Sequence, residues 1–181
     1  GLMKSFSNFI LRLIGWKITG QTELPEKCVI CVAPHTSNWD LPLGLTVYSA
    51  LGRKASFLIK KEWFFFPMNL IFKGLGGIPV DRSRKTSLTE QMSEIYAKRE
   101  NFQLAITPEA TRKLNAEWKK GFYFIALAAN VPIVVAALDY GKKEADFKKI
   151  LMPTGDVDAD LEIIKACYKG VVAKHPQYFS L

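Results

Sequence analysis

The chain has 181 residues, of which 49% are hydrophobic and 23% are charged, and its net charge at neutral pH is +8. This length fits one domain with a sizeable core, and this composition excludes a disordered chain and a coiled coil. The excess of lysine and arginine favours an anionic partner, which can be nucleic acid, an anionic membrane or a phosphorylated small molecule.

The first residues predict an amphipathic helix over residues 2–16, because apolar side chains recur at helical spacing on one face. These side chains are Leu2, Phe6, Phe9, Ile10, Leu13 and Ile14. One interpretation places the helix in a membrane interface, supported by Lys4, Arg12 and Trp16. The other packs it on the protein's own core, and the sequence leaves both open. We expect a single domain over residues 1–181, with residues 1–20 as its N-terminal amphipathic segment.

No stretch of the sequence approaches the roughly 18 consecutive apolar residues of a transmembrane helix. The N-terminal apolar run is interrupted by Asn8 and Arg12, and no small-residue cleavage site follows it, so a signal peptide is not expected. An odd number of cysteines without a disulfide framework suggests a reducing compartment. The expected location is therefore peripheral, on the cytoplasmic face of a membrane.

Two of the three cysteines, Cys28 and Cys31, form a C-x-x-C inside an apolar run that predicts a buried strand. Strand residues three positions apart point to opposite faces of a sheet, so these thiols are poorly placed to share a metal or to form a disulfide. We therefore expect two small core residues here.

Strand-like and helix-like segments alternate along the rest of the chain. The expected strands are residues 28–33, 56–59, 78–80, 103–107 and 133–138, and the expected helices are 38–50, 87–99, 119–130 and 161–174. Such alternation predicts an α/β fold in which helices sandwich a largely parallel, mixed sheet. In such folds the reactive groups gather beyond the carboxyl ends of the strands.

Residues 62–72 differ from the rest because four aromatic residues are consecutive, Trp63, Phe64, Phe65 and Phe66. A helix cannot bury four adjacent aromatic side chains on one stripe, so some are expected to face lipid, an acyl chain or a partner. The alternative is a helix that is enclosed on all sides.

Of the two histidines, His175 lies in a polar tail, whereas His35 follows a predicted strand and precedes a predicted helix. Asp40 falls in the first turn of that helix, from which its carboxylate can reach back to the imidazole. Asp40 would then fix the tautomer and stabilise the imidazolium, and the other ring nitrogen would act as general base. A catalytic pair of this kind suits activation of a hydroxyl that the substrate brings.

A purely structural interpretation of the same residues stays open. Ser37 or Asn38 is a good first residue for the helix, and Ser37-x-x-Asp40 has the form of a capping box. In that case Asp40 only caps the helix, and His35 is a loop histidine with ordinary hydrogen bonds.

Two further segments combine a strand end with charged residues. In G-G-I-P-V-D-R, residues 76–82, Arg82 can bind a phosphate through two parallel hydrogen bonds. In T-P-E-A-T-R-K, residues 107–113, Glu109 can orient neighbouring donors or an acceptor molecule, and Arg112 adds positive charge. Each segment alone also fits an ordinary surface loop.

The motif H-T-S-N-W-D at residues 35–40, the two charged segments and the apolar V-P-I-V at residues 131–134 resemble, in order, the four sequence blocks of one family. The chain resembles the glycerolphosphate acyltransferase superfamily over residues 28–140, and the lysophosphatidic acid (1-acyl-sn-glycerol-3-phosphate) acyltransferase branch especially. Two positions depart from the family pattern. Ala110 stands where the family has glycine, which is awkward if the loop needs a positive φ there, and Lys113 stands where the family often has serine.

The resemblance implies a fatty acyl thioester donor (acyl-CoA or acyl carrier protein), a lysophospholipid-like acceptor at a membrane surface, and a role in phospholipid biosynthesis. It implies no metal and no organic cofactor. It makes His35 the base and Asp40 its orienting residue, and Arg82 and Arg112 the phosphate ligands. The substrate-binding residues that it implies are Asn38, Arg82, Glu109, Thr111 and Arg112.

Two other functions remain as alternatives. In an acyl thioesterase, His35 would activate water in place of a lipid hydroxyl. A non-enzymatic module would bind membranes or nucleic acid through its basic residues. The lysine pairs at residues 60–61, 119–120, 142–143 and 148–149 are scattered, which is more typical of solvated faces than of a nucleic-acid track, so nucleic acid is not an expected partner.

Overall fold

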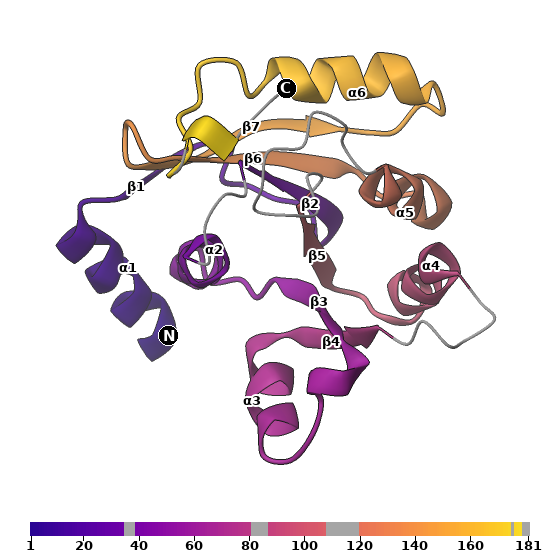
Figure 1. The fold of residues 1–181 in the computed structure, drawn as a ribbon, viewed down its shortest axis with the longest axis horizontal. Coiled ribbons are helices and arrows are strands. Elements are labelled where there is room, and N and C mark those ends of the chain that lie inside the picture. Colours follow the sequence, from indigo (N-terminus) through magenta and orange to yellow (C-terminus); the bar gives the residue numbers. More distant parts are fainter. Residues whose placement is uncertain (35–38, 81–86, 108–119, 175, 179–181) are drawn as a thin grey trace.

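The structure is a computed structural model that describes residues 1–34, 39–80, 87–107, 120–174 and 176–178 (Figure 1). In these residues seven strands form one sheet, in the order β1-β7-β6-β2-β5-β3-β4. The strands are β1 (Lys17–Gly20), β2 (Lys27–Ala33), β3 (Ser56–Lys60), β4 (Gly77–Val80), β5 (Phe102–Ile106), β6 (Ile133–Asp139) and β7 (Glu144–Leu151). The helices are α1 (Leu2–Ile14), α2 (Asp40–Ala50), α3 (Met68–Leu75), α4 (Leu88–Lys98), α5 (Gly121–Ala129) and α6 (Val157–Ala166), with short 3-10 helices at Lys61–Trp63 and Pro176–Tyr178.

The sheet is mixed and largely parallel. Neighbouring strands run parallel except β6 and β7, which form an antiparallel hairpin. All seven residues of β6 are buried, as expected for a central strand that helices cover on both faces. The predicted α/β fold with a largely parallel, mixed sheet is confirmed.

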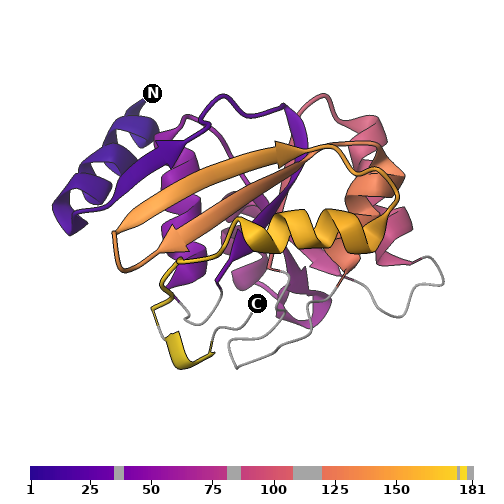
Figure 2. The same ribbon diagram turned by 90° about the horizontal axis from the view of Figure 1, so that it is seen from above.

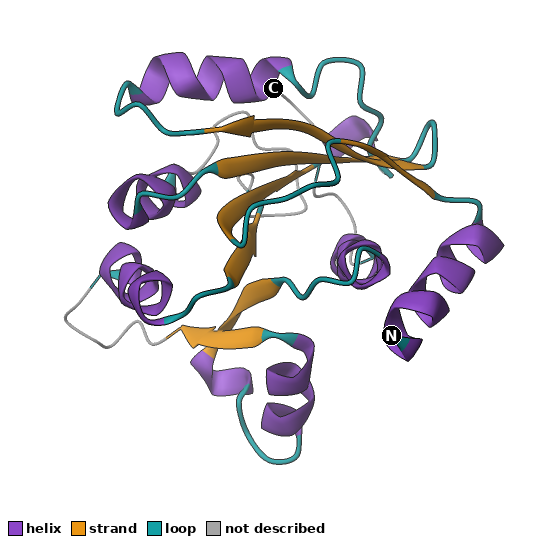
Figure 3. Ribbon diagram, turned by 180° about the vertical axis from the view of Figure 1, so that it is seen from behind, coloured by secondary structure: helices purple, strands orange, loops and turns teal. Residues whose placement is uncertain are grey.

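Helices cover both faces of this sheet, so the protein has two buried layers (Figures 1 and 3). One layer joins α4, α5 and α6 to the sheet, and the other joins α1 and α2 to its opposite face. Seen from above, α6 lies across the β6–β7 hairpin (Figure 2). The two cysteines of the C-x-x-C motif are fully buried and form no disulfide, Cys31 in the first layer and Cys28 in the second. The prediction that they point to opposite faces is confirmed.

The N-terminal amphipathic segment is only partly helical. Gly15 adopts φ +80°, a left-handed conformation that favours glycine, and its N–H caps the end of α1. Residues 17–20 then form β1, which pairs with β7 at one edge of the sheet. The helix predicted over residues 2–16 is thus confirmed over Leu2–Ile14, whereas β1 was not predicted.

The C-terminal helix lies earlier in the chain than predicted. The side chain of Asp156 accepts a hydrogen bond from the Ala159 N–H at 3.2 Å, so α6 begins at Val157 and ends at Ala166. The expected range of 161–174 followed the apolar residues and missed this cap, which fixes the start of the helix.

Candidate active site

The three charged motifs follow strands that end at one edge of the sheet. Because β2 runs parallel to β5 and β6, and β3 runs parallel to β4 and β5, the carboxyl ends of these strands lie on the same side. Pro34, Val80 and Thr107 are the last described residues at that edge, where Pro34 precedes the first motif and Val80 and Thr107 belong to the other two. The predicted residues His35, Asn38, Arg82, Glu109, Thr111 and Arg112 lie outside the described residues.

Asp40 is the predicted site residue that the structure describes. It is the first residue of α2 and is only 4% exposed. Its Oδ1 accepts a hydrogen bond of 2.6 Å from the phenol of Tyr140, which follows β6. Such a short bond to a buried carboxylate is typical of a charge-assisted hydrogen bond. Asp40 therefore lies at the carboxyl edge of the sheet, where the sequence predicted it.

The predicted capping box is wrong. The helix begins at Asp40 itself, its N-cap residue is Trp39, and the Trp39 side chain makes no capping hydrogen bond. In a capping box with Ser37 as the N-cap residue, the helix would begin at residue 38 and Asp40 would be its third residue. The carboxylate of Asp40 instead accepts a hydrogen bond from Tyr140, the residue after β6, so Asp40 remains a candidate site residue.

Tyr140 was not predicted from the sequence. Its ring packs edge-on against Trp16, with the ring centroids 5.0 Å apart, and the Lys174 ammonium lies 5.9 Å from its centroid. Burial and the hydrogen bond to Asp40 raise its pKa, so the phenol stays protonated and acts as a donor. The available signal was its place directly after a buried strand, at the edge where functional groups gather.

An apolar cavity of about 320 Å³ lies between α2 and the sheet. Asp40 and Thr107 line it, as do Gly44 of α2 and the buried side chains of Tyr48 and Phe147. Most of its other lining residues are aliphatic, and they come from α2 and from strands β2, β3, β5, β6 and β7. A buried carboxylate therefore borders a space that suits a hydrocarbon chain. Among the described residues, no three His, Cys, Asp or Glu side chains gather as a metal site requires.

The described surface carries two exposed apolar faces. On α1, Ser7 and Leu11 are buried, and Asn8 Nδ2 donates to the carbonyl of Ala50 at 3.0 Å, so this side packs on α2. The opposite side of α1 exposes Leu2, Phe6, Phe9 and Leu13 by 54–89%. The interpretation that α1 packs on the protein's own core is therefore confirmed for one side of the helix, and the apolar residues of the other side are exposed.

The second apolar face belongs to α3 and the residues before it. Helix α3 buries none of its residues, and Phe66 and Leu70 are 79% and 61% exposed. The alternative of a helix enclosed on all sides is wrong, because α3 lies beyond the last strands of the sheet with little packed against it (Figure 1). No helix within the described ranges has the length and hydropathy needed to span a membrane.

Comparison with known proteins agrees with this arrangement. The family model described as Acyltransferase matches residues 15–139. The chain is 32% identical over 137 residues to 1-acyl-sn-glycerol-3-phosphate acyltransferase beta of Homo sapiens, a match that covers 72% of this chain and 48% of that protein. The chain thus spans about half the length of this relative. Among solved structures, the 1-acyl-sn-glycerophosphate (LPA) acyltransferase PlsC of Thermotoga maritima has the same fold, with a TM-score of 0.60 at 18% identity, covering 93% of this chain and 75% of that one.

Proposed function

Because the chain belongs to the Acyltransferase family, we propose that it transfers a fatty acyl group from an acyl thioester to the hydroxyl of a lysophosphatidate-like acceptor. The observation that supports this most directly is the buried Asp40 carboxylate, which lines an apolar cavity of about 320 Å³ at the carboxyl edge of the sheet. A carboxylate beside an apolar space fits a reaction that joins a charged acceptor to a hydrocarbon chain.

In the proposed reaction, His35 removes the proton of the acceptor hydroxyl while that oxygen attacks the thioester carbonyl. Asp40 orients the imidazole and stabilises the imidazolium. Backbone N–H groups at the start of α2 stabilise the oxyanion. The carbon–sulfur bond then breaks, and the imidazolium returns its proton to the leaving thiolate, so the products are the acyl ester and the free thiol.

The acceptor phosphate binds Arg82 and Arg112 in this proposal, and Asn38, Glu109 and Thr111 complete the acceptor site. Support comes from the strands, since β4 and β5 end at the same edge as β2, directly before the segments that contain these residues. The donor is acyl-CoA or acyl carrier protein, and the reaction uses neither a metal nor an organic cofactor.

The acyl chain is proposed to enter the cavity beneath α2. Each methylene group transferred from water to apolar surroundings contributes about 0.8 kcal/mol, so an apolar cavity favours long-chain donors. The sequence suggested the aromatic segment 62–72 as a shelter for this chain, but none of the described residues of that segment lines the cavity.

We further propose that the protein binds the membrane surface peripherally, through the exposed apolar face of α1. Arg12 in the last turn of this helix and the net charge of +8 favour an anionic bilayer. The exposed side chains around α3 are available for the same contact.

The test of the proposed function is an assay of His35→Ala and Asp40→Asn with mixed acyl donors and lysophosphatidate, read by mass spectrometry. Loss of a general base typically lowers the rate by about 10²–10⁴-fold, and we expect such a loss with the fold intact. Wild-type activity in purified His35→Ala would remove this mechanism. Release of free fatty acid without an acylated product would identify a thioesterase instead.

Arg82→Ala tests the acceptor site separately. Because the guanidinium is proposed to bind the phosphate of the acceptor, its loss should raise the KM for lysophosphatidate and leave the KM for the acyl donor unchanged. An unchanged KM for lysophosphatidate would contradict the phosphate contact.

A further inference from the structure

We propose that Tyr140 is a positioning residue for acyl transfer, whose phenol holds the Asp40 carboxylate in the orientation that the imidazole of His35 requires. This inference rests on the proposed function, because Tyr140 acts only through the pair formed by His35 and Asp40. Tyr140 would thus be a third residue that acts together with His35 and Asp40, and it lies outside all of the sequence motifs.

The contact is short, and its acceptor is buried. Tyr140 Oη lies 2.6 Å from Asp40 Oδ1, and Asp40 is 4% exposed. A hydrogen bond to a buried carboxylate is stronger than one in water, because the surrounding dielectric is low. The bond restricts rotation of the carboxylate about its last torsion, which would otherwise be broad.

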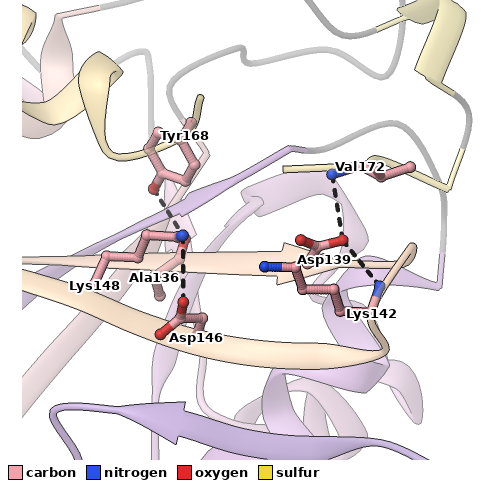
Figure 4. A network of polar contacts seen from close by, with 7 residues as sticks. All are labelled: Ala136, Asp139, Lys142, Asp146, Lys148, Tyr168 and Val172. Atoms are coloured by element: carbon pink, nitrogen blue, oxygen red, sulfur yellow. Dashed lines mark hydrogen bonds and ion pairs between the residues drawn. The ribbon is translucent and has the colours of Figure 1, made fainter. Parts of the chain in front are cut away.

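The backbone around Tyr140 is itself held in place. The Asp139 carboxylate accepts hydrogen bonds from the N–H groups of Lys142 and Val172 at 3.2 and 3.3 Å (Figure 4). It also accepts one from the N–H of Gly141 at 3.0 Å. The N–H of Tyr140 donates to the carbonyl of Val172 at 2.7 Å. The turn after β6 is thereby fixed to the C-terminal segment.

The ring of Tyr140 is fixed as well, by its edge-on contact with Trp16, a residue that is 8% exposed. A donor whose backbone and ring are both held has little freedom to follow the carboxylate. The carboxylate therefore adjusts to the phenol, and Tyr140 determines where Asp40 points.

The charges near this contact are limited among the described residues. Lys174 of the C-terminal segment faces the rings of Tyr140 and Trp39, at 5.9 and 5.6 Å from their centroids. On β7, Asp146 lines the cavity but is ion-paired with Lys148 at 3.3 Å. The phenol remains the donor to Asp40 at any pH used in an assay, because its pKa is raised by burial and by Asp40.

The hydrogen bond also affects the proton affinity of the imidazole. A phenol that donates to a carboxylate withdraws part of its negative charge, so the carboxylate stabilises the imidazolium less strongly. Removal of the phenol should raise the pKa of His35 and leave the imidazole less well oriented. A residue with a merely structural role would change neither.

The test is Tyr140→Phe, which keeps the ring on Trp16 and removes only the hydroxyl. We expect kcat to fall by about tenfold, the amount that loss of a hydrogen bond to a charged group explains, with little change in KM. The acidic limb of the pH profile of kcat/KM should shift to higher pH by about half a unit or more. One pKa unit corresponds to only 1.36 kcal/mol, so a small gain in stabilisation of the imidazolium is enough to cause this shift.

The protein offers a matched control in Tyr123, whose phenol donates to the buried Asp160 carboxylate, also at 2.6 Å, away from the cavity. Tyr123→Phe removes the same kind of bond, so it should lower the melting temperature and leave kcat and the pH profile at their wild-type values. In an Asp40→Asn background, Tyr140→Phe should cause no further loss of kcat.

A second measurement does not depend on activity. The chain has two histidines, His35 and His175, so the imidazole resonances of labelled protein can be followed by NMR as the pH is varied. We expect a higher pKa for His35 in Tyr140→Phe than in the wild type, and the titration can be recorded at low temperature if the variant is less stable.

The outcomes separate this inference from the proposed function. Full activity of His35→Ala would overturn both. A large loss in His35→Ala and Asp40→Asn, with wild-type kcat, pH profile and His35 titration in Tyr140→Phe, would overturn the role of Tyr140 alone. A fall in melting temperature without any of these changes would make Tyr140 a structural residue.

Discussion

Three aspartates in the described part of the chain are buried, and each carboxylate is bound in a different way. Asp40 accepts a hydrogen bond from a phenol, Asp139 accepts backbone N–H groups, and Asp160 accepts hydrogen bonds from Tyr123 and Thr154. A buried carboxylate is stable only with such partners. Of the three, only Asp40 lines the apolar cavity. The other two fix a turn and the start of a helix, so burial alone does not distinguish the proposed site residue.

Asp160 should make stability depend on pH. Burial acts to raise its pKa, but hydrogen bonds from Tyr123 and Thr154 outweigh burial and hold the pKa below its usual range. The folded state therefore favours the charged form, so this stabilisation is complete above the unfolded pKa of about 3.9 and is lost as the pH falls through the lower folded value.

We expect Asp160→Asn to lower the melting temperature by several degrees at pH 7, because about 1–3 kcal/mol is lost and each kcal/mol corresponds to about 2–4 °C at this size. The difference from the wild type should shrink as the pH is lowered from 5 to 3. Calorimetry across this range measures both effects.

Asp158→Asn is the matched control, since Asp158 lies on the same helix with a side chain that is 92% exposed. Its melting temperature should follow the wild type at every pH. A difference in Asp160→Asn that stayed constant between pH 5 and pH 3 would show that the charge of Asp160 does not contribute.

At the scale of single elements, α2 forms one wall of the cavity, and one of its lining residues is a glycine with free space beside it. Gly44 lines the cavity, and a Cβ added there would meet no atom within 4 Å. Leucine also has a higher helix propensity than glycine, by up to about 1 kcal/mol. Gly44→Leu should therefore fill part of the cavity without unfolding the helix.

In the proposed function, the Gly44→Leu variant should discriminate between acyl donors by length. We expect kcat/KM for long-chain donors to fall by about tenfold or more, while the shortest donors keep their wild-type value within about twofold. Gly74→Leu is the control, because Gly74 of α3 is also surrounded by open space but is exposed and far from the cavity lining. An equal loss for all donors would mean that the acyl chain binds elsewhere.

The exposed side of α1 allows a second test at this scale. Phe6 and Phe9 are 56% and 54% exposed, so Phe6→Ser with Phe9→Ser should leave the melting temperature nearly unchanged. Binding to anionic lipid vesicles should weaken by more than about tenfold, because full burial of one such side chain contributes about 1.5–3 kcal/mol.

The control for vesicle binding is Phe124→Ser, which changes a phenylalanine that is 42% exposed on α5. Sedimentation with vesicles at low and high salt separates the apolar from the electrostatic part of the binding. If the α1 variant and the wild type sedimented equally, α1 would not be the membrane contact.

For the whole molecule, the alternation of apolar runs was enough to predict the α/β class and five of the seven described strands. Strand β1 could not be predicted, since its four residues form a strand only by pairing with β7. Strand β7 is only half apolar, because four of its eight residues are Glu144, Asp146, Lys148 and Lys149, so its apolar run is less continuous than that of β6. These two strands depend on tertiary pairing more than on local pattern.

The candidate site was predictable to the extent that its residues lie in short motifs. The position of Asp40 at the start of a helix after a buried strand follows from the sequence nearby. Its contact with Tyr140 does not, because the two residues are 100 positions apart and meet only when β6 pairs with β2. The cavity is likewise lined by α2 and by strands β2, β3, β5, β6 and β7, so no local sequence pattern predicts it.

The pairing of β1 with β7 also has a consequence for synthesis on the ribosome. Lys17 pairs with Glu144, so the edge strand has no partner until most of the polypeptide has been translated. At about 5–20 residues per second, this delay is on the order of ten seconds. During that time α1 has no finished sheet to pack on, and its phenylalanines stay exposed. In the proposed membrane binding, attachment to lipid would therefore begin before the sheet is complete.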